Sequence, residues 1–248
     1  MKSLDCLTKE CIELLHKNRL LKPLISAELL KEELSNIIIE SELKDDIVKN
    51  FTKKLGLSDK NSYDLWLAKN SMNKTEFENL ALKELKIQRF CQKNLDHKIE
   101  QHFLERKAKL DIVVYSLIRV SSIYIARELF SRLVHKEDEF GDLAESYSDG
   151  IEKNTRGVIG PCTLDKAHPK LAQLLRSSEP GKISGPCQID NYFVIIRLES
   201  YTSAKLDDFM REKMGIELFE KLLDSRVNES YVKILNSHKS KEMIGEQI

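Results

Sequence analysis

Glycine and proline are concentrated in one internal stretch of this 248-residue chain, and their distribution restricts its fold more than any other feature. Residues 113–200 hold four of the five prolines and six of the nine glycines. Both residue types interrupt helices and mark turns. The flanks, 1–111 and 201–248, are nearly free of them and rich in Leu, Lys and Glu. The pattern predicts two helical flanks around a compact insert.

In both flanks, apolar residues recur at helical spacing. The first flank predicts helices from about Ile25 to Ser41 and from Asp45 to Leu55, and one long helix from Glu76 towards Lys109. The second flank predicts a helix from about Leu206 to Leu223, with a frayed tail after His238. Because no segment of the insert covers the apolar stripe of this last helix, we expect it to pack on the N-terminal helices.

The insert changes to the β-branched composition that is typical of strands. Ile112–Val120 predicts a buried strand, Ile183–Ile189 an edge strand and Tyr192–Leu198 the closing strand. Short helices are expected between the first two strands, and residues 148–161 are expected to form a polar loop. The fold class is therefore α+β, with a small antiparallel sheet and packed helices.

The expected organisation has three parts. Residues 1–111 form an N-terminal helical module, and residues 112–200 form the strand-containing domain. Residues 201–248 form a C-terminal helix that packs back on the module, followed by the frayed tail. The insert, at about 90 residues, has the size of a domain.

Charge and cysteine content argue against several classes of protein. Forty basic residues balance forty acidic ones, whereas nucleic-acid-binding proteins carry a basic excess, so no nucleic-acid partner is expected. The five cysteines lack the spacing of zinc ligands, and their number is odd, so we expect no metal, no disulfide framework and no cofactor. No apolar run reaches the roughly 18 residues of a membrane span, and Asp5, Lys9 and Glu10 interrupt any leader, which predicts a cytoplasmic protein.

Five short motifs in the insert occur together in the order of one known family. They are Ala126–Phe130, Phe140–Asp149, Gly157–Gly160, Pro180–Pro186 and Asn191–Arg197. Together they resemble the parvulin-type (rotamase) peptidyl-prolyl cis-trans isomerase domain. The helical flanks resemble those of bacterial foldases with a parvulin-like domain and a chaperone module, and the chain is similar to cyanobacterial parvulin-like proteins.

The resemblance implies a peptide-binding groove on the insert. Its residues, matched to family positions or lying close to the expected groove, would be Leu117, Ile159, Cys162, Ala167, Leu171 and Phe193. Leu117 and Phe193 stand where the family has two histidines. Asp149 is the one residue that could replace the family's Cys or Asp, and it is the candidate catalytic residue.

Two functions remain open at this point. One is a PpiC-like isomerase and foldase that binds extended or proline-containing polypeptides, with weak cis-trans activity despite the two replaced histidines. The other is an inactive peptide-binding chaperone or an adaptor for a peptide maturation or export complex. In both cases the expected partner is an unfolded or extended client polypeptide.

Overall fold

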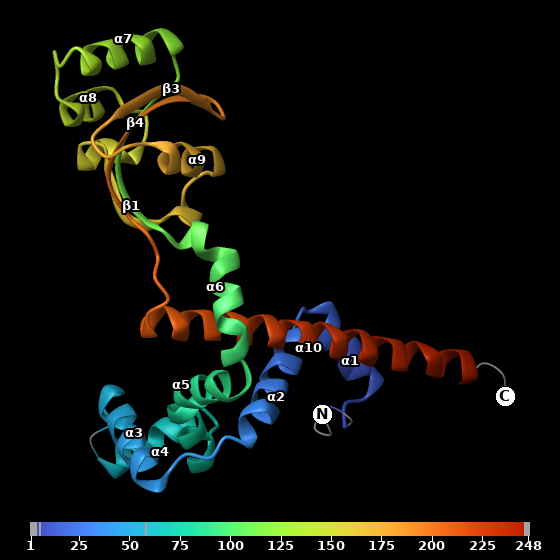
Figure 1. The fold of residues 1–248 in the computed structure, drawn as a ribbon. Coiled ribbons are helices and arrows are strands. Elements are labelled where there is room, and N and C mark those ends of the chain that lie inside the picture. The colour runs from blue at the N-terminus through green and yellow to red at the C-terminus, as the bar shows by residue number, and fades with distance from the viewer. Residues whose placement is uncertain (1–3, 5, 58, 246–248) are drawn as a thin grey trace. The chain divides into compact units, whose positions relative to one another are not determined.

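The computed structural model describes residues 4, 6–57 and 59–245, with side chains described as far as residue 236. The chain divides into two compact units, each of which is drawn in Figure 1. The helical unit comprises residues 1–102 and 207–248, and the sheet unit comprises residues 103–206. A helical host with an inserted α+β domain is thus the observed architecture. The boundaries lie somewhat outside the predicted limits of 112 and 200.

The sheet unit contains four strands and several short helices. Its elements are β1 (Ile112–Val120), α7 (Ile123–Val134), α8 (Phe140–Tyr147), the 3-10 helix η2 (Ile151–Thr155), β2 (Val158–Thr163), the 3-10 helix η3 (Leu164–Lys166), α9 (Pro169–Ser177), β3 (Ile183–Ile189) and β4 (Tyr192–Thr202). All pairings are antiparallel, and the strand order is β2-β1-β4-β3. The strand that contains Pro186 therefore lies at an edge, where a missing backbone N–H is tolerated.

Strand β2 differs from the sequence prediction, which placed a polar loop at residues 148–161. The structure instead has η2 followed by an edge strand, and β2 pairs with β1 from Ile112↔Thr163 to Ser116↔Val158. Gly160 allows this pairing because its φ is +112° and a Cβ there would lie 2.6 Å from the carbonyl oxygen of Val113. The two glycines and the proline of this segment interrupt the alternation of apolar and polar residues, so the sequence pattern did not indicate a strand.

The two faces of the sheet carry separate apolar clusters. Cluster A contains Val113, Tyr115 and Leu117 of β1 and the α9 residues Leu171 and Leu175, among others. Cluster B, on the opposite face, contains β1 residues that alternate with those of cluster A, together with residues of α7 and α8. Successive strand residues point to opposite faces, so the central strands are buried on both sides.

The helical unit is built from segments at both ends of the chain. Its helices are α1 (Lys9–Lys17), α2 (Leu21–Ser35), α3 (Ser41–Lys54), α4 (Lys60–Lys69), α5 (Lys74–Asn94), the first part of α6 (Asp96–Leu110) and α10 (Asp208–Gly245). Val227 of α10 packs with Ile25 and Leu29 of α2, and Phe219 packs with Phe90 of α5 at a ring-centroid distance of 5.1 Å. The C-terminal helix thus packs on helices of the N-terminal flank.

Two helix limits differ from the prediction. The single helix expected from Glu76 to Lys109 is broken at Leu95 into α5 and α6. The side-chain amide of Asn94 donates to the carbonyl oxygen of Phe90 (3.0 Å), a local bond that competes with helix continuation. Helix α10 continues past Leu223 to Gly245, and residues 246–248 lie outside the described residues. The fraying expected after His238 stays a prediction. In the described part of the chain, no helix is long and apolar enough to cross a bilayer.

Phe77 of α5 is the centre of an aromatic cluster in the helical unit. Its side chain is fully buried, and the rings of Phe51, Tyr63 and Trp66 meet it edge-on at centroid distances of 5.4, 5.0 and 5.4 Å. Edge-to-face contacts of this kind add to the stabilisation from burial. Three helices, α3, α4 and α5, therefore depend on this one side chain.

We predict that Phe77→Ala lowers the free energy of unfolding of the helical unit by about 3–5 kcal/mol, because it removes a fully buried ring and leaves a cavity. Fluorescence of Trp66, the only tryptophan, reports this unfolding in a urea titration. Phe209→Ala is the matched control, since Phe209 is 74% exposed, and its effect is expected to stay within about 0.5 kcal/mol. Equal effects of the two substitutions would contradict the role given to Phe77.

Candidate functional site

Five of the six predicted groove residues lie together on one face of the sheet. Leu117 and Leu171 are buried members of cluster A, and Ile159, Cys162 and Ala167 are half-buried residues packed against it. They come from β1, β2, α9 and the residue that follows η3. A buried apolar base with a partly accessible margin is thus present where the family resemblance placed the groove.

Phe193 does not belong to this group. It packs against cluster B, on the opposite face of the sheet, and pairs with Val120. Its neighbour Val194 lies in cluster A, as does Ile196, the partner of Leu117. A shift of one residue reverses the face of a strand side chain. The β4 residue that shares the face of Leu117 is therefore Val194, and the prediction for Phe193 was wrong by one position.

Cys162 contributes an uncharged side chain to the margin of the cluster. Burial raises the pKa of its thiol, with opposing effects from Lys166 and Asp165. Because only the thiolate is a good nucleophile or metal ligand, a thiol with a raised pKa acts here as a small apolar group. No group of three His, Cys, Asp or Glu side chains suited to a metal ion occurs among the described residues.

Tyr115 is a polar residue of this face that sequence reasoning missed. Its side chain is only 5% exposed in cluster A, and burial raises the pKa of its hydroxyl to about 12. No described residue hydrogen-bonds this hydroxyl, yet no fully buried polar side-chain atom of the described chain lacks a partner. The oxygen must therefore reach solvent at the edge of the cluster. The two-residue spacing from Leu117 was the signal that would have found it.

Asp149 has backbone partners in the structure. Its carboxylate accepts a hydrogen bond from the N–H of Ser121 (2.9 Å), and its own N–H donates to the carbonyl oxygen of Arg119 (2.8 Å). These bonds tie the residue after α8 to the end of β1. The catalytic role predicted for Asp149 stays a prediction, whereas its contribution to the turn is visible.

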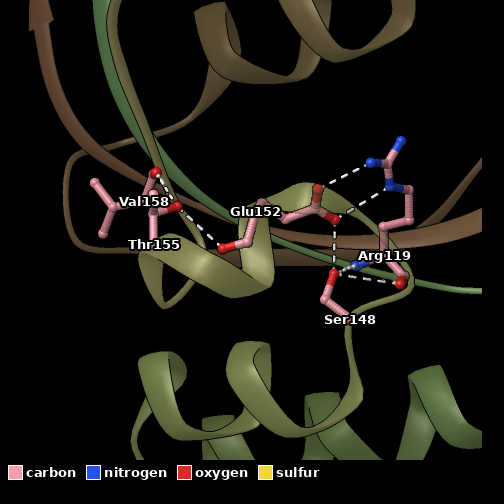
Figure 2. Close-up of polar contacts among 5 residues, drawn as sticks. All are labelled: Arg119, Ser148, Glu152, Thr155 and Val158. Carbon is pink, nitrogen blue, oxygen red and sulfur yellow. Dashed lines mark hydrogen bonds and ion pairs between the residues drawn. The ribbon is translucent and has the colours of Figure 1, made fainter.

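A buried polar network beside Asp149 fixes the start of β2 (Figure 2). The guanidinium of Arg119 donates to both carboxylate oxygens of Glu152, at 3.1 and 2.8 Å, and the Ser148 hydroxyl donates to the same carboxylate at 2.6 Å. The Thr155 hydroxyl lies 3.0 Å from the Glu152 carbonyl oxygen and 2.7 Å from that of Val158. The network thus connects β1, the end of α8 and η2 with the strand that carries Ile159.

Gly150 leaves the space that this network occupies. A Cβ at this position would lie 1.9 Å from a guanidinium nitrogen of Arg119 and 2.1 Å from a carboxylate oxygen of Glu152. Glu152 itself is only 3% exposed, so its charge depends on these partners. Burial alone would raise the pKa of Glu152, but hydrogen bonds from Ser148, the backbone and Arg119 outweigh it and lower the pKa.

We predict that Glu152→Gln lowers the free energy of unfolding of the sheet unit by about 2 kcal/mol at pH 7, since it weakens charge-assisted hydrogen bonds. The wild-type contribution is present above the unfolded-state pKa near 4.5 and is lost as the pH falls through the lower folded-state pKa. Thermal unfolding from pH 7 down to pH 3, followed by circular dichroism, should show the variant and the wild type converging. Glu145→Gln, at an exposed position of α8, is the control and should change little. A gap that does not narrow as the pH falls below 4.5 would contradict the assignment.

One protein-family model matches part of the sheet unit. The family model of the PPIC-type PPIASE (rotamase) domain matches residues 119–200. The comparison with curated proteins found no match.

Several solved structures are similar to the chain at low identity. A peptidylprolyl isomerase (PrsA) from Bacillus anthracis is 19% identical with a TM-score of 0.47, and the match covers 87% of this chain and 97% of that one. PrsA from Bacillus cereus is 15% identical with a TM-score of 0.46, covering 95% and 88%. One of two SurA-like chaperones of Campylobacter jejuni is 16% identical with a TM-score of 0.39, covering 86% and 92%.

The assignment of the domain rests on the family match. The matched segment includes part of β1, all of β2 and β3, and nearly all of β4. Residues 119–200 of this chain are therefore a PpiC-type domain of the parvulin (rotamase) peptidyl-prolyl isomerase family.

Proposed function

We propose that the protein is a parvulin-like foldase whose sheet unit binds an extended, proline-containing segment of a client polypeptide. The observation that carries this proposal is the convergence of Leu117, Ile159, Cys162, Ala167 and Leu171 in one apolar cluster of a PpiC-type domain. The half-buried residues of β2 supply accessible apolar surface at its margin. A prolyl ring placed against them would leave water, which favours binding.

The chemistry of such a site requires shape more than reactive groups. Rotation about an X-Pro amide crosses a barrier near ~20 kcal/mol, and no bond is broken. The twisted transition state has lost amide resonance and is less polar than the planar amide. A site that excludes water from the amide therefore stabilises the transition state more than the ground state, which is the condition for catalysis.

Tyr115 supplies the polar group that the replaced histidines no longer provide. A tyrosine hydroxyl is protonated at neutral pH, and burial raises the pKa of this one further, to about 12, so it is a hydrogen-bond donor without a described partner. Leu117 and Val194, on the same face, offer no hydrogen bond of their own. A peptide carbonyl or the prolyl nitrogen at the cluster margin would give the hydroxyl its partner.

The alternative is a chaperone or adaptor that binds clients without turning over their prolyl bonds. Its support is the apolar character of the positions at Leu117 and Val194 and the backbone bonds that occupy Asp149. An adaptor role in a peptide export or maturation complex belongs to this alternative. Cytoplasmic localisation also stays a prediction, which cell fractionation would test.

The decisive experiment measures cis-trans exchange of a proline-containing peptide by NMR at increasing protein concentration. We expect exchange above the buffer rate and a fall of about tenfold in catalytic efficiency for Tyr115→Phe, the equivalent of one hydrogen bond of about 1.4 kcal/mol. The variant should unfold at the same temperature as the wild type, because the hydroxyl has no described partner to lose. Exchange at the buffer rate with retained binding would select the inactive chaperone.

A second prediction locates the binding surface. Ile159→Asp should weaken binding of the same peptide by at least about tenfold, because it places a charge at the apolar margin. Val158→Asp is the matched control on the same strand, since Val158 is 44% exposed and lies outside both clusters. Titration by fluorescence anisotropy measures both. Equal losses of peptide affinity in the two variants would contradict a binding surface at cluster A.

A further inference from the structure

The helical unit has a groove of its own, remote in sequence from the PpiC-type domain. Helices α2 and α5, with the turn between α4 and α5, enclose a volume of about 600 Å³. Its apolar lining includes Leu30 and Leu34 of α2, Met72 of the turn and Leu80 of α5. Leu80 remains 38% exposed, although it faces other apolar side chains. None of these residues has a role in the site on the sheet.

The spacing of the α2 residues suits a polypeptide ligand. Ala27, Leu30, Lys31 and Leu34 of the lining follow the spacing i, i+3, i+4 and i+7, so they form one stripe along the helix. From Ala27 to Ser35 this stripe extends for about 12 Å, at roughly 1.5 Å per residue. A groove bordered by a helical stripe of this kind accepts the apolar face of a peptide segment.

The charged residues of the groove are mostly lysines, and two of them lack an acidic partner. Lys31 is paired with Glu28 at 3.0 Å, and the Glu76 carboxylate accepts the backbone N–H of Asn73 at 2.8 Å. Lys83 has no ion pair among the described residues, and the partner of Lys86 is the uncharged side-chain oxygen of Asn79, at 2.9 Å. The rim therefore carries positive charge that the described chain does not neutralise.

The surroundings of Lys86 reinforce this excess. Partial burial lowers the pKa of its ammonium group, and the nearby charge of Lys44 lowers it further. The one carboxylate of the groove lining, Glu76, forms no described ion pair with this lysine, so an acidic group brought by a ligand would oppose both effects. Positive charge at the rim and leucines at the base together favour a ligand that is apolar at its centre and acidic at its ends.

We propose that the groove between α2 and α5 docks a leucine-rich segment of a client polypeptide flanked by acidic residues, which contact Lys83 and Lys86. The inference rests on the proposed function in one respect, namely that the occupant is a client polypeptide. It adds a second binding surface, with a selectivity based on charge that the apolar site of the sheet unit lacks. A client would then be bound at a prolyl segment and at an acidic-apolar segment.

The test uses the full chain and two fluorescent, proline-free peptides that share a leucine-rich centre. One carries glutamates at both ends and the other carries lysines. We expect the glutamate peptide to bind at least about tenfold more tightly. Its affinity should fall when ionic strength rises from about 0.1 M to about 1 M, which shortens the Debye length from about 10 Å to about 3 Å.

Two variants and a control connect the binding to the groove. The double substitution Lys83→Glu with Lys86→Glu should abolish the preference for the glutamate peptide, and Leu80→Asp should weaken both peptides. Lys221→Glu, at an exposed lysine of α10 outside the groove, should change neither. Thermal unfolding of each variant by circular dichroism checks that the helical unit is intact. Since Lys83 and Leu80 are exposed, we expect unchanged melting.

The outcomes separate this inference from the function of the sheet unit. Binding of the proline-containing peptide, measured on the same variants, should stay at the wild-type value. Equal affinity for the glutamate and lysine peptides, or no binding of either, overturns the groove proposal even if the prolyl peptide binds. Self-association of the chain that disappears in the double variant would assign the groove to a second copy, and it would also overturn the proposal. Charge-selective binding without any binding of the prolyl peptide would support the groove proposal and contradict the proposed prolyl site of the sheet unit.

Discussion

Burial of β1 and β4 on both faces is the constraint on which the sheet unit depends. The buried apolar residues of these two strands belong to one of two clusters. The antiparallel register, with Leu117 opposite Ile196, sets the face on which each of them lies. Cluster B packs α7 and α8 against one face of the sheet. Cluster A holds α9 against the other face, and half-buried residues of β2 lie at its margin.

The polar network at Arg119, Ser148 and Glu152 complements this apolar arrangement. Edge strands have hydrogen bonds to the sheet on one side only, so their position needs further support. Here a buried carboxylate with three hydrogen bonds from side chains anchors η2, and Thr155 links η2 to Val158 at the start of β2. The half-buried residues of β2 are thus held by charge and hydrogen bonding as well as by apolar contacts.

Much of this organisation could be predicted from local patterns. The distribution of Gly and Pro separated the helical host from the insert, and β-branched runs marked β1, β3 and β4. Strand β2 was missed because Gly157, Gly160 and Pro161 interrupt its alternation, and its pairing with β1 is a tertiary property. The prediction that Phe193 shares a face with Leu117 was wrong because a short motif can be aligned one residue out of place. In a strand, a shift of one residue moves the side chain to the other face of the sheet.

The predicted end of a helix was wrong for a related reason. The break at Leu95 depends on a bond from the Asn94 side chain, which competes with a strong helical pattern on both sides. In the same way, the lysines on the rim of the α2–α5 groove look like ordinary solvated residues in the sequence. Only the structure shows that Glu28 pairs with Lys31 while Lys83 and Lys86 have no acidic partner among the described residues.

The division of the helical unit between the two ends of the chain has a consequence for biosynthesis. Helix α10 supplies Phe219 and Val227 to the clusters around α2 and α5, and it is synthesised after the inserted domain. The inserted domain, complete at residue 206, can fold while its host still lacks one wall. During translation the N-terminal helices therefore keep apolar surface uncovered until α10 has been synthesised.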